Sequence, residues 1–157
     1  MSDSLYLDTS VIGYVASRLS RDVLTLAHQQ LTRDWWAAHR QRFELHVSEL
    51  VLFEASRGDP EAARERLQIL EGLPVLRITQ EARTLADQIF SVTQLPDKAA
   101  SDALHLALSA VNGMDFLATW NCTHIANAVV LKVVNRVCRD NGYEPPIVCT
   151  PEELMTP

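Results

Sequence analysis

The chain has 157 residues, a formal net charge of −6, and 47% hydrophobic and 22% charged residues. These values fit one soluble globular domain spanning 1–157, and they exclude disordered, collagen-like and coiled-coil proteins. No apolar stretch approaches the ~18 residues of a membrane span. The three cysteines form no Cys-x-x-Cys pair, so we expect free thiols and a cytoplasmic location.

The acidic balance argues against a broad nucleic-acid-binding surface, because phosphate contacts rest mostly on Lys and Arg. Carboxylates gathered around a metal ion would, however, also make a nuclease acidic. The five glycines form neither a G-x-G-x-x-G motif nor a Gly-Lys-Ser/Thr motif. The sequence therefore excludes the usual dinucleotide-binding and P-loop nucleotide-binding motifs.

Short apolar runs alternate with longer segments that have helical periodicity. Predicted strands are 5–7, 44–47, 74–78, 116–118 and 146–149. Predicted helices are 24–38, 48–56, 60–71, one that Thr79 caps, 98–112, 124–140 and a short one after 150. Asp59-Pro60 is typical of a helix start, and Thr150-Pro151-Glu152-Glu153 is a capping box.

Alternating strands and helices predict an α/β protein, a three-layer α/β/α sandwich with a central, mostly parallel sheet of four or five strands. Ligands of such sheets bind beyond the carboxyl ends of the strands, where the strand order switches. The polar residues that directly follow each strand are therefore the first candidates for a functional site.

Asp8 follows the first strand and Asn121 follows the fourth, and we expect these two strands to be neighbours. Asp102 lies near a helix start, and Glu49 and Glu54 lie on the helix after the second strand. Carboxylates that converge in one cleft repel one another unless a cation neutralises them, and hard oxygen ligands favour Mg²⁺ or Mn²⁺. Glu49 and Glu54 are about 140° apart around a helix, so one face cannot present both.

Four short motifs follow one another along the chain: Leu7-Asp8-Thr9-Ser10; Val47-Ser48 with Glu54 and Arg57-Gly58; Asp102-Ala103-Leu104-His105-Leu106-Ala107; and Thr119-Trp120-Asn121. In their order and spacing they resemble the motifs of the PIN-domain family. Within the family the closest likeness is to the small stand-alone VapC toxins of bacterial type II toxin–antitoxin pairs.

The resemblance implies a Mg²⁺- or Mn²⁺-dependent ribonuclease that hydrolyses RNA phosphodiester bonds. It makes Asp8, Glu54 and Asp102 metal-binding carboxylates and Asn121 the fourth catalytic and metal-binding position. It also implies a homodimer and a cognate antitoxin protein. Many relatives have Asp where Asn121 stands, and a neutral amide adds no charge, so the number of metal ions stays open. The expected mechanism is in-line attack on phosphorus by a metal-bound water.

Each candidate also has a structural interpretation. Asp8 could cap the following helix, Glu54 could pair on the surface with Arg57, Asp102 could be a charge near a helix start, and Asn121 could be a turn residue. His105 reads more readily as a packed, hydrogen-bonded histidine than as a ligand, while His124 could approach a phosphate.

Two further functions are considered. One is a catalytically degenerate PIN-like module that binds RNA or protein, suggested by Asn121 and the acidic composition. The other is a phosphatase or phospho-acceptor with Asp8 as nucleophile. The haloacid-dehalogenase-like pattern needs a second Asp two residues later, and Ser10 stands there.

Overall fold

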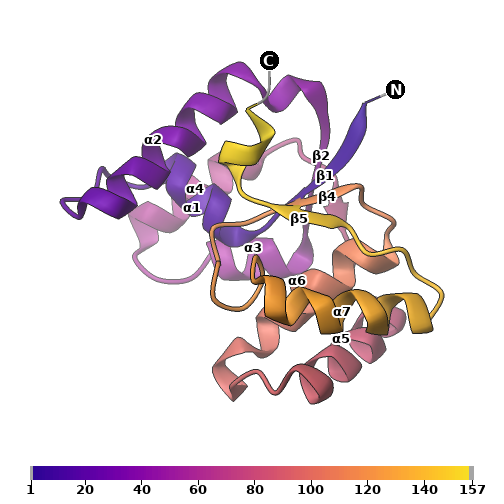
Figure 1. The fold of residues 1–157 in the computed structure, drawn as a ribbon. Coiled ribbons are helices and arrows are strands. Elements are labelled where there is room, and N and C mark those ends of the chain that lie inside the picture. The colour runs from indigo at the N-terminus through magenta and orange to yellow at the C-terminus, as the bar shows by residue number, and fades with distance from the viewer. Residues whose placement is uncertain (1, 156–157) are drawn as a thin grey trace.

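The computed structural model describes residues 2–155, and its centre is a five-stranded, all-parallel sheet (Figure 1). The strand order is β3-β2-β1-β4-β5. The strands are β1 (Asp3–Leu7), β2 (Phe43–Ser48), β3 (Val75–Leu76), β4 (Phe116–Ala118) and β5 (Ile147–Cys149). The predicted α/β class and parallel sheet are confirmed.

Helices connect the strands and cover both faces of the sheet. They are α1 (Thr9–Ala16), α2 (Val23–Ala38), α3 (Glu49–Ala55), α4 (Pro60–Leu70), α5 (Gln80–Thr93), α6 (Ala100–Val111) and α7 (Ala128–Asp140). Short 3₁₀ turns are η1 (Arg40–Arg42), η2 (Asp97–Ala99) and η3 (Pro151–Leu154). Helix α1 packs against α2 and α4, and α5 packs against α6 and α7. Figure 1 shows these two groups on opposite sides of the sheet, which gives the three-layer sandwich.

The direction in which the chain crosses the sheet explains the two helical layers. From β1 the chain moves to β2 and β3 on one side, and then returns to add β4 and β5 on the other side. Because parallel crossovers are right-handed, the two directions place their helices on opposite faces. The carboxyl ends of β1 and β4 therefore form the switch point at which ligands of such sheets bind.

Several helix starts follow from single capping residues in the sequence. Asp59 caps α4 ahead of Pro60, and Thr79 caps α5, as predicted. The capping box of Thr150 and Glu153 is also formed, and it begins a 3₁₀ turn. Ser48 ends β2 and caps α3 through its hydroxyl, which accepts a hydrogen bond from the Val51 amide at 3.2 Å.

Three predicted boundaries were wrong. The last long helix was expected from 124, but α7 begins at Ala128 because the Asn127 side chain caps it, accepting from Val129 and Val130. The third strand was expected over 74–78, but pairing ends at Leu76, and the Ile78 amide donates to Glu49 instead. The helix expected from 98 begins at 100, after the 3₁₀ turn η2.

The core lies on both faces of the central strands. Leu5, Tyr6 and Leu7 of β1 are all fully buried, and so is Trp35 of α2. This burial fixes the end of β1, and with it Asp8, on a rigid part of the fold. Within residues 2–155, no helix has both the length and the apolar character needed to cross a membrane.

Candidate functional site

Asp8 is held at the switch point between β1 and β4. Its amide donates to the Ala118 carbonyl at 3.2 Å, which joins the ends of the two strands. Oδ1 accepts hydrogen bonds from the Ser10 amide (3.0 Å), the Ser10 hydroxyl (2.6 Å) and the Val11 amide (3.3 Å). Oδ2 accepts from the Thr119 hydroxyl at 2.5 Å. The capping interpretation of Asp8 is thus confirmed, and the same bonds fix the orientation of its carboxylate.

Burial dominates the electrostatics of Asp8. The side chain is only 3% exposed, and removal from water raises the pKa of its carboxyl above the ordinary value of 3.8. Attraction to a protonated His105 and the hydrogen bonds from Ser10, Thr119 and Val11 favour the charged form and partly oppose this shift. A carboxyl buried in this way gains strongly from any nearby positive charge.

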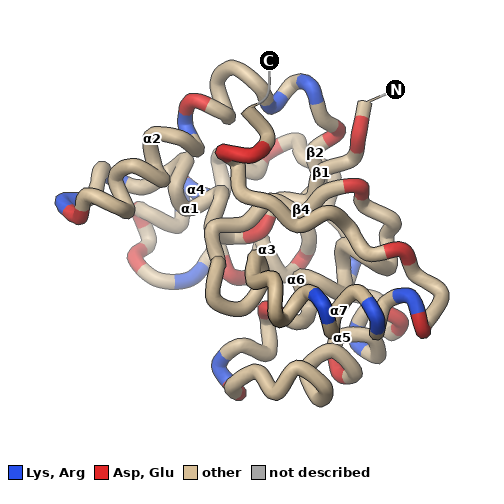
Figure 2. The backbone as a smooth tube through the Cα atoms, viewed as in Figure 1, with Lys and Arg blue, Asp and Glu red and all other residues tan. Residues whose placement is uncertain are grey.

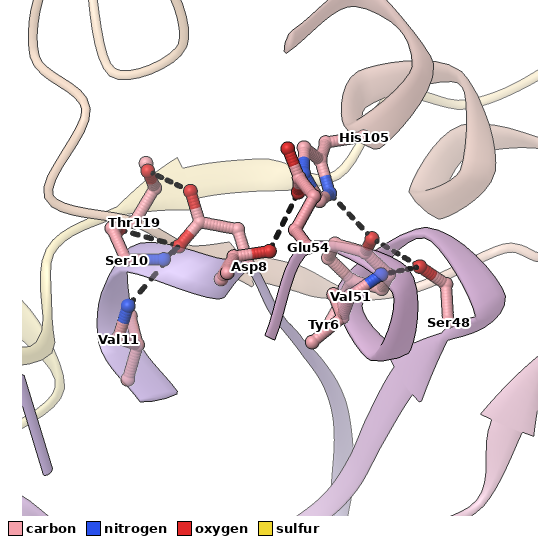
Figure 3. A network of polar contacts seen from close by, with 10 residues as sticks. Tyr6, Asp8, Ser10, Val11, Ser48, Val51, Glu54, His105 and Thr119 are labelled. Atoms are coloured by element: carbon pink, nitrogen blue, oxygen red, sulfur yellow. Dashed lines mark hydrogen bonds and ion pairs between the residues drawn. The ribbon is translucent and has the colours of Figure 1, made fainter. Parts of the chain in front are cut away.

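Glu54 projects from α3 toward the same edge (Figure 3). Its Oε1 is 2.7 Å from His105 Nε2 and accepts a hydrogen bond from the Thr9 hydroxyl at 2.6 Å. Partial burial alone would raise the pKa of Glu54, but the hydrogen bonds from His105, Thr9 and Ser101 outweigh it and lower the pKa. Glu54 therefore carries a negative charge at neutral pH.

The choice between the two glutamates of α3 agrees with their geometry. Glu49 is exposed and accepts from the Ile78 amide at 2.8 Å, on a different side of the helix. The alternative interpretation, a surface pair of Glu54 and Arg57, is not what forms, because the Arg57 guanidinium lies over the Phe53 ring at 5.5 Å. Glu54 pairs with His105 instead.

Asp102 lies in the first turn of α6 and pairs with a histidine of the loop after β4. Its Oδ2 is 3.0 Å from His124 Nδ1, and the Asp102 and His124 side chains are 17% and 20% exposed. Its neighbour Ser101 hydrogen-bonds Glu54, which places the start of α6 beside α3. The loop of His124 therefore contacts the candidate site through a carboxylate, not as a free phosphate-binding group.

Asn121 organises that loop. Its side-chain Oδ1 accepts from the His124 amide at 2.9 Å, and its carbonyl accepts from the Ala126 amide at 2.8 Å. The turn interpretation of Asn121 is therefore confirmed. Its role as a fourth metal ligand stays a prediction, and the amide oxygen it would use is engaged with the loop backbone.

The acidic residues share an edge without forming a closed ligand cage. Within residues 2–155, no group of three or more His, Cys, Asp or Glu side chains is arranged to hold a metal ion. Glu54 and Asp102 each face a histidine, and Asp8 faces hydroxyl and amide donors. Helices α1, α3 and α6, which border the site, contain no Lys or Arg (Figure 2).

Residues that the motif pattern left without a role connect the site to the core. Thr9 follows Asp8 in the sequence, and its hydroxyl donates to Glu54. Thr119 donates to Asp8 and also accepts from the Asn121 amide at 2.9 Å, which links Asp8 to the loop after β4. Tyr6 and Ser48 continue the network behind His105 (Figure 3). Hydroxyl residues at the ends of β1, β2 and β4 were the one sequence signal that could have pointed to them.

Comparison with known proteins identifies the family. The PIN-domain family model matches residues 5–121, so the chain belongs to the PIN-domain family. No curated protein matches the chain in sequence.

The fold is similar to those of two solved VapC toxins. The first is Mycobacterium tuberculosis VapC20, described as a toxin that cleaves the sarcin-ricin loop (18% identity, TM-score 0.55, covering 76% of this chain and 92% of that one). The second is VapBC2 from Rickettsia felis bound to a DNA fragment from its promoter (13% identity, TM-score 0.58, covering 93% and 97%).

Proposed function

We propose that this PIN-domain protein is a divalent-metal-dependent endoribonuclease of the VapC-like toxin type. The observation that supports the proposal most is the position of three carboxylates from separate parts of the chain. Asp8 lies at the end of β1 at the β1/β4 switch point; Glu54 on α3 contacts its neighbour Thr9, and Asp102 on α6 follows Ser101, which hydrogen-bonds Glu54. The structural likeness to toxins, one of which cleaves RNA in the sarcin-ricin loop, supports the choice of substrate.

The donor chemistry fits Mg²⁺ or Mn²⁺, which prefer oxygen ligands. Asp8, Glu54 and Asp102 would hold the ion, with Asn121 as the proposed fourth position. The ion would polarise the phosphodiester and lower the pKa of a water for in-line attack on phosphorus. Because α1, α3 and α6 supply no Lys or Arg, a bound cation is the means by which these carboxylates could approach a phosphate.

The chain's own residues prepare the site in two different ways. Four hydrogen bonds fix the Asp8 carboxylate, so little side-chain entropy remains to be lost when it binds a ligand. The lowered pKa of Glu54 keeps that carboxylate charged. His124 Nδ1 lies 3.0 Å from Asp102, which ties this carboxylate to the loop after β4.

The partners are also proposals. The Rickettsia felis neighbour is a VapBC complex on promoter DNA, and we infer a cognate antitoxin for this chain by analogy, together with a homodimer. Cys122, Cys138 and Cys149 are free thiols, which suits a reducing cytoplasm.

The function can be tested by removing one charge at a time. Asp8→Asn and Asp102→Asn should each abolish Mg²⁺-dependent RNA cleavage while circular dichroism shows an intact fold. Asp115→Asn is the matched control, because Asp115 bonds Ser4 at the opposite edge of the sheet. Undiminished cleavage by either site variant would refute the assignment.

A degenerate PIN module that binds RNA or protein is the second candidate. It is favoured by the engagement of the Asn121 amide oxygen in a turn and by the absence of a three-residue metal cluster within residues 2–155. It predicts no cleavage by highly purified protein with any RNA. Cleavage that EDTA removes and Mn²⁺ restores would exclude it.

A further inference from the structure

A chain of hydrogen bonds runs from the core to Glu54 (Figure 3). Ser48 Oγ is 2.9 Å from the Tyr6 hydroxyl, which is 2.7 Å from His105 Nδ1. His105 Nε2 is 2.7 Å from Glu54 Oε1. Tyr6 and Ser48 are fully buried and His105 is 3% exposed, so each polar atom of the chain depends on its protein partner.

The two ends of this chain determine where its hydrogens lie. At one end the Val51 amide donates to Ser48 Oγ. At the other end Glu54 Oε1 already accepts from the Thr9 hydroxyl, and a carboxylate oxygen also accepts from a ring N–H. The Tyr6 hydroxyl, like any phenol at neutral pH, carries its proton. The consistent arrangement has Ser48 donating to Tyr6, Tyr6 donating to His105 Nδ1, and His105 Nε2–H donating to Glu54.

The opposite arrangement fails at both ends. A neutral imidazole with its proton on Nδ1 would present the lone pair of Nε2 to a carboxylate oxygen at 2.7 Å. If His105 Nδ1 donated to Tyr6, the Tyr6 proton would turn to Ser48, and the buried Ser48 hydroxyl would lose its own acceptor. An unsatisfied buried hydroxyl is strongly unfavourable.

We propose that His105 is a positioning residue, set by Tyr6 and Ser48 in its Nε2–H tautomer, that aims Glu54 at the metal ion. This inference rests on the proposed function. His105 and Thr9 both bind Oε1 of Glu54, and Ser101 also hydrogen-bonds this carboxylate, so three side chains fix the direction in which Glu54 points. Hydrogen-bond partners of metal ligands commonly change metal affinity by about 10–100-fold when they are removed.

The tautomer can be tested on the metal-free protein. Long-range ¹H–¹⁵N spectra of ¹⁵N-histidine-labelled protein distinguish the two ring nitrogens, and the His105→Gln spectrum identifies the His105 signals. We expect one Nε2–H tautomer, and in Tyr6→Phe a larger shift at Nδ1 than at Nε2. Tyr143→Phe, beyond the end of α7, is the control. Any other protonation pattern at His105 in the native protein overturns the proposal.

The positioning role can be tested by Mn²⁺ binding, measured by calorimetry without RNA. His105→Leu should weaken binding about 10–100-fold, and His105→Gln, whose amide can still donate to Glu54, should restore most of the affinity. His46→Gln on β2 is the matched control. Unchanged Mn²⁺ affinity in a folded His105→Leu variant would refute the positioning role alone. Cleavage that survives Asp8→Asn would instead refute the function, with the tautomer unaffected.

Discussion

Replacing Asp8 by asparagine should stabilise the metal-free protein at neutral pH while it removes the proposed activity. Burial raises the pKa of the Asp8 carboxyl above 3.8, so the folded state holds this proton more tightly than the unfolded chain does. Below about pH 4 both states are protonated. As the pH rises, the unfolded chain ionises first, and stability falls until the folded carboxyl has also ionised.

The size of the effect follows from the contacts of Asp8. Each unit by which folding raises a pKa lowers the free energy of unfolding by about 1.4 kcal/mol above the folded pKa. Asparagine is as good a helix cap as aspartate and keeps the bonds from Ser10 and Val11. Its NH2 group takes the place of Oδ2, so the Thr119 hydroxyl must accept from the side chain instead of donating to it, a loss of roughly 1 kcal/mol. We expect the cost of ionising the buried carboxyl to exceed this loss, so that Asp8→Asn raises Tm at pH 7.5.

Thermal unfolding followed by circular dichroism between pH 4 and 8, in EDTA, measures this difference. The gain of Asp8→Asn should be present at pH 7.5 and should shrink as the pH approaches 4. Saturating Mn²⁺ should make the native protein more stable than Asp8→Asn, because a ligand at 100 times its Kd stabilises the folded state by about 2.7 kcal/mol. A variant that is less stable than the native protein at pH 7.5 in EDTA would refute the burial argument.

Three further changes test the surroundings of Asp8. Glu54→Gln should lower the free energy of unfolding by less than about 1 kcal/mol at pH 7, because folding lowers the pKa of this partly exposed carboxyl. In the same thermal scans, the difference between variant and native protein should fade as the pH falls through the folded pKa of Glu54. Thr119→Val should lower the free energy of unfolding in urea by about 1–3 kcal/mol, because the buried Asp8 oxygen loses its donor. Gly13→Ala should raise the free energy of unfolding, measured in urea, by about 0.5–1 kcal/mol. Gly13 is inside α1, and an added Cβ meets no atom within 4 Å.

Much of the fold was predictable because local chemistry and tertiary packing agree. Asp59, Thr79 and Thr150 act as caps in the sequence and in the structure. The start of α7 was not predictable from periodicity, since the apolar pattern continues upstream of Asn127. Asn121 instead holds residues 122–126 in a turn, so residues 124–126 are not part of α7. The bonds of this turn span three to five residues, as those of a first helical turn do.

The site was predictable as a set of residues but not as a set of contacts. The PIN-like motifs select Asp8, Glu54 and Asp102, and helical geometry separates Glu54 from Glu49. Nothing in the sequence pairs Glu54 with a residue 51 positions away, because that contact depends on how α3 and α6 meet. Tyr6 stands between two leucines of β1 and reads as core, which it is, while its hydroxyl reaches the site.

The two central carboxylates respond to their surroundings in opposite directions, and this contrast bears on what the site does. Asp8 resists ionisation because it is buried, whereas Glu54 favours ionisation because three donors surround it. Helices α1, α3 and α6 place no Lys or Arg beside Asp8, and His105, when protonated, is the positive group that acts on its carboxylate. A buried carboxylate without a permanently charged partner is typical of a functional site. Because the ligand form is the ionised one, Mn²⁺ should bind more tightly as the pH rises through the folded pKa of Asp8. Affinity that is independent of pH would show that Asp8 is not a ligand.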